Sequence, residues 1–89
     1  MAKTSKTLQE KDLELLGIKS LIDGGRITKM ADFMKLSPTK LAKALGINYG
    51  RYMAKLAHPE KFTVGEIVKM AATLEVDKQV LFNIASQSI

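Results

Sequence analysis

The chain has 89 residues, 46% of them hydrophobic, which is enough apolar material for one small core and excludes two domains. It contains no cysteine, so a disulfide framework and a thiolate metal site are both excluded. The basic start MAKTSKT is followed by LQEKDLELLG rather than by a continuous apolar run. We therefore expect no signal peptide, no transmembrane span, no membrane partner and a cytoplasmic location.

The formal net charge of +5 is concentrated in one part of the chain, residues 35–61, which we call the basic window. This window carries six basic side chains and one acidic side chain, whereas the charges of residues 1–34 and of residues 62–89 nearly cancel. Binding to phosphate groups requires such a concentration of positive charge. Lysines that merely solvate helix faces would give a similar net charge, so charge alone leaves both interpretations open.

The first predicted helix runs from Thr7 to about Asp23. Apolar residues recur at spacings of three and four here and in the rest of the chain, which favours helices throughout. Thr7 and Glu10 form a capping-box pattern, and Gly24 and Gly25 end the helix. Its apolar side is predicted to consist of Leu8, Leu15, Ile18 and Ile22.

A second amphipathic helix is predicted after the glycine pair, ending near Leu36. Its apolar stripe comprises four residues with Phe33 beside them, namely Ile27, Met30, Ala31 and Met34. We assign this helix to the core rather than to a functional site.

Two short helices joined by a tight turn are predicted between Ser37 and Leu56, in the run SPTKLAKALGINYGRYMAKL. Ser37 is suited to the N-cap of the first helix, and Pro38 is suited to its first position, where a missing N–H costs nothing. Gly46 can adopt the left-handed conformation that ends this helix. Its inward-facing residues are predicted to be Leu41, Ala42 and Leu45.

The second helix of the pair is predicted to begin after Asn48, which is a good N-cap, with Ile47 and Tyr52 forming a hydrophobic staple across it. Four residues at helical spacing are predicted to face the core: Tyr49, Tyr52, Met53 and Leu56. The outer face would then consist of Gly50, Arg51, Ala54 and Lys55.

Two further helices complete the predicted fold. Pro59 interrupts the chain, Thr63 and Glu66 form a second capping box, with Phe62 and Ile67 as a staple, and Asp77 caps the last helix. Their apolar residues are Ile67, Met70, Ala71, Leu74, Val80, Leu81 and Ile84, whereas Phe82 either closes the core or belongs to a partner surface. The sequence thus predicts an all-α fold, a compact bundle of five to six short helices in a single domain over residues 7–89.

Residues 37–81 resemble the helix-turn-helix domain of the phage repressor and Cro type, also called the xenobiotic-response-element family. The resemblance is carried by LAKALGIN at residues 41–48 and by TVGEIVKMAATLEV at residues 63–76. It implies a lambda-repressor-like bundle with the helix-turn-helix at about residues 37–57. It also implies a transcriptional regulator that binds double-stranded operator DNA with sequence selectivity, commonly as a homodimer.

The chain departs from this family where DNA would be read. Many phage repressors have a glutamine at the start of the first helix of the pair, and this chain has Pro38 there. Gly50 and Ala54 on the outer face cannot donate a side-chain hydrogen bond to a base edge. These departures favour an alternative function, a protein-interaction module such as an antitoxin-like component, which keeps the fold and binds DNA weakly or without specificity.

Three residues are the predicted base contacts. Arg51 has the planar fork that pairs with guanine, and Asn48 and Tyr49 lie at the start of the same helix. The alternative for Asn48 is that it serves only as a cap, and the alternative for Tyr49 is that it belongs mainly to the core with its hydroxyl on a phosphate. The predicted phosphate contacts, which position the protein without reading sequence, are Thr39, Lys40, Lys43, Lys55 and Lys61.

The remaining candidate residues carry no predicted chemistry. Residues 1–6 are expected to form a flexible basic arm, in which Lys3 and Lys6 either follow a minor groove or belong to a disordered end. His58 is the only histidine, so we interpret it as a turn residue. No nucleophile with an adjacent base and no phosphate-cradling glycine loop occurs, so we expect no enzyme activity, no metal and no cofactor.

Overall fold

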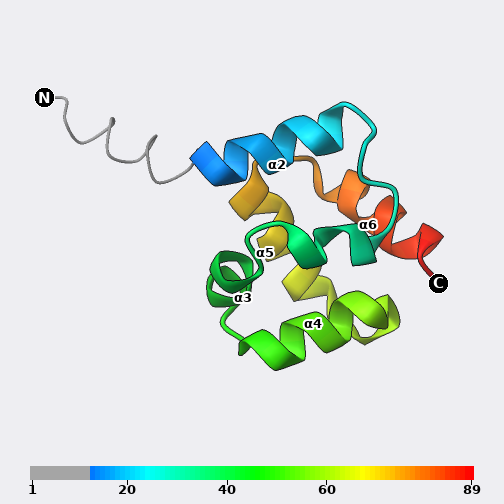
Figure 1. Ribbon diagram of the computed structural model, residues 1–89. Helices are drawn as coiled ribbons and strands as arrows, with labels where there is room; N and C mark the ends of the chain where they lie inside the picture. The colour runs from blue at the N-terminus through cyan, green and yellow to red at the C-terminus, as the bar shows by residue number, and fades with distance from the viewer. Residues whose placement is uncertain (1–12) are drawn as a thin grey trace, which may run out of the picture.

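The structure is a computed structural model that describes residues 13–89, and within this range it consists of helices without any strand (Figure 1). Two 3-10 helices lie in the connections of this range: η1 (Met30–Lys35) between the first and second α-helices, and η2 (Pro59–Lys61) between the third and fourth. In chain order the α-helices are α2 (Leu13–Asp23), α3 (Pro38–Leu45), α4 (Tyr49–Ala57), α5 (Val64–Leu74) and α6 (Lys78–Gln87). The predicted all-α fold is confirmed for this part of the chain. No helix in residues 13–89 is both long enough and apolar enough to cross a membrane.

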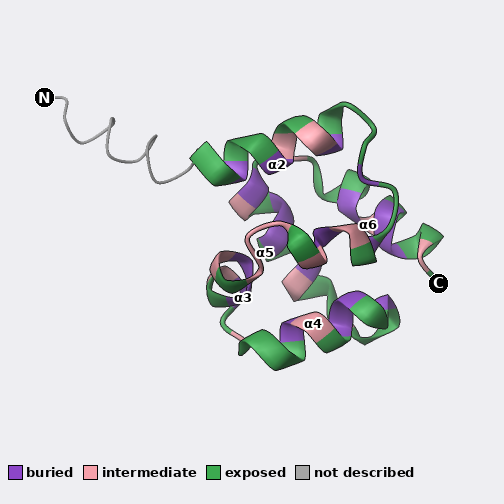
Figure 2. Ribbon diagram, viewed as in Figure 1, coloured by how far each residue is buried: buried purple, intermediate pink, exposed green. Residues whose placement is uncertain are grey.

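One apolar core lies between the helices, and α5 is at its centre because it packs against α2, α3 and α6 (Figure 2). Each fully buried leucine or phenylalanine side chain contributes roughly 1.5–3 kcal/mol of transfer free energy. The largest fully buried side chains are Met30, Phe33, Leu41, Tyr52, Leu56, Met70, Leu74 and Leu81. Most of the predicted core faces are confirmed, because buried residues include Leu15, Ile18, Ile22, Ala42, Leu45, Ile67, Ala71 and Ile84. The predicted Thr7–Glu10 capping box, Leu8 and the basic arm lie outside the described residues.

The predicted stripe of the second helix is wrong in detail because this segment, η1, is a 3-10 helix. A 3-10 helix has three residues per turn, so side chains three apart lie on one line. Met30 and Phe33 are accordingly both fully buried, whereas Ala31 is exposed and Met34 is only half-buried. Phe33, predicted to lie beside the stripe, therefore belongs to the centre of the core.

Three of the predicted helix caps are confirmed. The Arg51 backbone N–H donates to Asn48 Oδ1 over 2.8 Å at the start of α4. The Glu66 N–H donates to Thr63 Oγ1 over 3.0 Å in a complete capping box at the start of α5. The Gln79 N–H donates to Asp77 Oδ1 over 2.8 Å at the start of α6. Each of these motifs depends on neighbouring residues alone, which is why the sequence predicts them.

Ser37 is the N-cap residue of α3 and Pro38 is the first residue of that helix, as predicted, but the cap is not the usual one. Ser37 precedes Pro38 and has left-handed backbone angles, with φ 47° and ψ 52°, and its side chain makes no cap hydrogen bond. Its hydroxyl instead donates to Glu14 Oε1 of α2 over 2.7 Å. The following proline disfavours the right-handed helical region, and a left-handed conformation costs about 1–2 kcal/mol in a residue with a side chain. A hydrogen bond to a distant helix has thus replaced the local cap hydrogen bond.

Candidate nucleic-acid interface

The helices α3 and α4 are joined by the three residues Gly46–Asn48 and pack directly against each other; we call them the α3–α4 pair. Gly46 has a φ of 74°, as predicted, a value that a residue with a side chain adopts only with strain. The Ile47 N–H then donates to Ala42 O over 3.1 Å, which satisfies a carbonyl at the end of α3. This turn fixes where α4 begins relative to α3.

The first turn of α4 is exposed (Figure 2). Arg51 and Asn48 are both exposed, and the Arg51 guanidinium makes no ion pair within residues 13–89. Tyr49 is 50% exposed, so the prediction that it faces the core is wrong. Tyr49 is the first residue of α4, and the buried side of the helix begins only at Tyr52. The three predicted base contacts are therefore together on one accessible turn.

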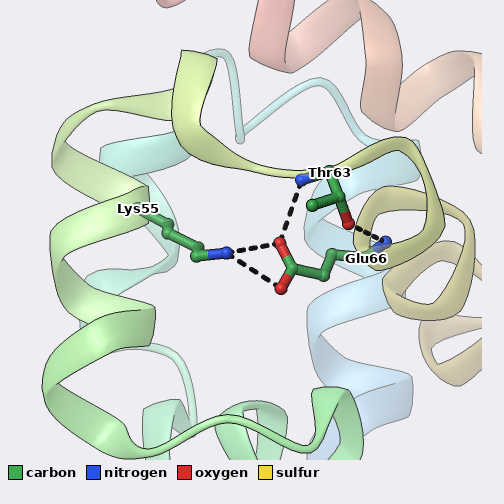
Figure 3. Close-up of polar contacts among 3 residues, drawn as sticks. All are labelled: Lys55, Thr63 and Glu66. Atoms are coloured by element: carbon green, nitrogen blue, oxygen red, sulfur yellow. Dashed lines mark hydrogen bonds and ion pairs between the residues drawn. The ribbon is translucent and has the colours of Figure 1, made fainter.

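Lys55 is the clearest failure of the predicted outer face of α4. Its residue exposure is 9%, and Nζ lies 2.7 Å from Glu66 Oε1 and 2.9 Å from Oε2 (Figure 3). A partly buried ammonium group is tolerated only when a carboxylate compensates its charge, and the start of α5 supplies one. Lys55 therefore connects two helices and has no free charge to offer to a phosphate group.

The Glu66 carboxylate holds three contacts at once (Figure 3). Besides the two contacts with Lys55, Oε1 accepts from the Thr63 N–H over 3.0 Å. Burial alone would raise the pKa of Glu66, but the hydrogen bonds from Lys55 and Thr63 outweigh it and lower the pKa below its ordinary value. The ionised carboxylate thus connects α4 to the capped start of α5.

The predicted phosphate contacts on α3 differ from one another. Thr39 and Lys43 are exposed, and Lys43 makes no ion pair within the described part of the chain. Lys40 is half-buried, and its Nζ lies 3.3 Å from Glu14 Oε1 of α2. The pKa of Glu14 is lowered by the hydrogen bond from Ser37 and by the neighbouring Lys40 ammonium. The charge of Lys40 is therefore already partly balanced inside the protein.

Two predicted residues lie beyond the C-terminal end of α4. Lys61 is exposed on η2, so it is separated along the chain from the exposed first turn of α4. His58 Nδ1 lies 4.0 Å from Glu60 Oε2, and residues 13–89 contain no cluster of three or more histidine, aspartate or glutamate side chains that could hold a metal ion. His58 is the C-cap of α4, in keeping with its interpretation as a turn residue.

An apolar groove with a volume of about 240 Å³ lies between the start of α5 and α6, and sequence reasoning found only part of it. Val64 is 67% exposed and Ile89 is 75% exposed. Phe82 is half-buried: it packs against the core and also lines the groove, so its position lies between the two predicted alternatives. The groove is lined further by Phe62, Ile67 and Ala85.

Sequence reasoning also missed Glu14 of α2, which contacts Ser37 and Lys40 at the start of α3. Glu14 is 23 residues from Ser37 in the chain, and no local pattern connects them. Glu66 was recognised only as a capping residue, because its contact with Lys55 depends on how α4 and α5 pack. No protein-family model, curated protein or solved structure matches the chain.

Proposed function

We propose that this protein is a DNA-binding transcriptional regulator in which the α3–α4 pair acts as a helix-turn-helix unit. The N-terminal half of α4 would enter the major groove of double-stranded DNA in the cytoplasm. The observation that carries the proposal is the exposed first turn of α4, where Asn48, Tyr49 and Arg51 lie together and the Arg51 guanidinium has no ion-pair partner in residues 13–89. A helix start of this kind is the part of a recognition helix that contacts base edges.

The side chains divide the work between reading and positioning. The Arg51 fork matches guanine O6 and N7, and the Asn48 amide nitrogen remains available although Oδ1 caps α4. Thr39 and Lys43 on α3 and Lys61 on η2 would contact phosphates, which fix register without reading sequence. Two copies of the chain on a two-fold symmetric site would double this small set of contacts.

Replacing Arg51 tests the proposal. We expect wild-type protein to enrich a two-fold symmetric motif from a pool of random duplexes. Arg51→Ala should weaken binding to that motif by about 1–3 kcal/mol and lose the preference at one base pair in each half-site, because a bidentate guanine contact is removed. Fluorescence anisotropy with the selected duplex and with a scrambled duplex measures both effects.

Arg51→Lys is the matched control for charge. Lysine keeps the positive charge but lacks the planar fork, so we expect Arg51→Lys to bind scrambled DNA as wild type does and not to recover the lost base preference. An Arg51→Ala protein that binds the selected duplex as tightly as wild type would contradict the assignment.

A protein-interaction module, such as an antitoxin-like component, is the second candidate function. It is favoured by the apolar groove and by Gly50 and Ala54, which are exposed on α4 without any side-chain donor. This function predicts that the random pool shows no enrichment and that a protein partner covers the groove. Val64→Glu would then abolish the protein complex while leaving the weak DNA binding unchanged.

A further inference from the structure

The contact between α2 and the start of α3 places a carboxylate on the surface that the proposed function assigns to phosphate. Glu14 Oε1 accepts from Ser37 Oγ over 2.7 Å and lies 3.3 Å from Lys40 Nζ. The side chains of Glu14 and Lys40 are 63% and 38% exposed, so the pair lies at the surface. A hydroxyl and an ammonium group are the donors that a phosphate oxygen also requires.

The same contact borders an open depression with a volume of about 390 Å³. Its lining combines Glu14, Ser37 and Lys40 with two of the proposed phosphate contacts, Thr39 and Lys43. Among residues 13–89, Glu14 is the only acidic residue of that lining. A DNA strand that contacts Thr39 and Lys43 would therefore bring a phosphate close to the Glu14 carboxylate.

We propose that Glu14 is an internal competitor for DNA phosphate, because its carboxylate occupies the donors of Ser37 and Lys40 that a phosphate would use. The inference rests on the proposed DNA binding through the α3–α4 pair. An exposed ion pair is weak, so a phosphate can displace it, but the displacement reduces the affinity. While Lys40 stays paired with Glu14 it neutralises no phosphate, so the DNA releases about one counterion fewer.

Replacing Glu14 with glutamine tests the competition. We expect Glu14→Gln to bind a mixed-sequence duplex about three- to fivefold more tightly than its control at 0.1 M salt, with a salt slope steeper by about one unit. The control is Asp23→Asn, which removes the same charge from the other ion pair of α2, Lys19–Asp23. Fluorescence anisotropy over a series of salt concentrations measures both quantities.

A second comparison separates competition for Lys40 from general repulsion. In a Lys40→Gln background we expect Glu14→Gln to lose most of its effect on affinity, because the donor that it releases is absent. An equal gain in both backgrounds, or equal affinities for Glu14→Gln and Asp23→Asn, would overturn the inference while the proposed function stands. Wild-type protein that binds no duplex even at low salt would overturn both.

Discussion

Tyr52 combines complete burial with a hydroxyl group that has no hydrogen-bond partner among residues 13–89. Burial raises the pKa of Tyr52, because the charged phenolate would lose its hydration. A buried hydroxyl without a partner costs about 1–3 kcal/mol, although the aromatic ring itself contributes favourably to the core. The ring of Tyr52 therefore stabilises the start of α4, and its hydroxyl does not.

Removing this hydroxyl should stabilise the protein. We expect Tyr52→Phe to raise the free energy of unfolding by about 1 kcal/mol, since the ring stays and the unsatisfied group is lost. Urea denaturation followed by circular dichroism measures the change. Tyr49→Phe is the control, because Tyr49 is half exposed and its substitution should leave stability unchanged. A less stable Tyr52→Phe protein would indicate that the hydroxyl has a partner after all.

The two residues of α4 whose environment was predicted wrongly show the limit of helical periodicity. The pattern predicted Tyr49 on the core face and Lys55 on the outer face, but it contains no information about where neighbouring helices lie or end. Tyr49 extends beyond the packed region because it is the first residue of α4. Lys55 is buried because Glu66 of α5 lies opposite it, and that pairing depends on tertiary packing.

At the scale of the elements, the Lys55–Glu66 contact connects α4 to the start of α5, whereas α4 packs mainly against α3, η1 and η2. The side chains are only 11% and 16% exposed, so the pair is shielded from solvent more than a surface salt bridge is. Breaking a shielded pair leaves one charge without compensation, which destabilises more than the pair itself contributes. The proposed reading helix is therefore linked by its Lys55 to a residue outside it, Glu66.

The pH dependence of stability reports on this contact. Because the pKa of Glu66 is lowered in the folded state, the unfolded chain binds its proton more tightly, and stability is lost as pH falls below about 4.5, its ordinary value. We expect Glu66→Gln to be less stable than wild type at pH 7 and to lose less stability between pH 7 and pH 3. Urea denaturation at several pH values measures this difference.

Glu75→Gln is the control for the loss of a carboxylate. Glu75 is exposed at the end of α5 and makes no ion pair within the described residues. We expect this variant to keep the wild-type difference in stability between pH 7 and pH 3. If Glu66→Gln keeps that difference too, the folded state does not depend on the ionised form of Glu66.

The elements differ in how far the sequence predicted them. The starts of α4, α5 and α6 were predicted well because their N-caps are contacts between residues at most three apart. The 3-10 form of η1 and the left-handed Ser37 were not predicted, because both depend on packing against distant elements. Ser37 bonds to α2, and Met30 of η1 donates its N–H over 2.8 Å to Ser88 Oγ beyond the end of α6.

For the molecule as a whole, the basic window is less basic in the folded state than in the sequence. Lys55 is paired with Glu66, and Lys40 is paired with Glu14. The remaining basic side chains of the window make no ion pair within residues 13–89, and they are Lys35, Lys43, Arg51 and Lys61. Fewer phosphates can therefore be neutralised than the six basic residues of the window suggest.

Two lysines of the window should respond in opposite ways to substitution. We expect Lys43→Gln to lower the salt slope of DNA binding by about one unit with unchanged stability, because an exposed phosphate contact is lost. Lys55→Gln should leave the slope unchanged and destabilise the protein, because Glu66 loses its counter-charge. Anisotropy titrations over a series of salt concentrations, together with urea denaturation, compare the two. Equal slopes for both variants would contradict this division of the window.

The most direct test of DNA binding through the α3–α4 pair is an NMR titration of the ¹⁵N-labelled protein with a short mixed-sequence duplex at low salt. We expect the largest amide shift changes at Asn48, Tyr49 and Arg51, with smaller changes at Thr39 and Lys43, because these residues form the proposed interface. No shift changes at all, or changes centred on the apolar groove instead of the first turn of α4, would contradict the proposed interface.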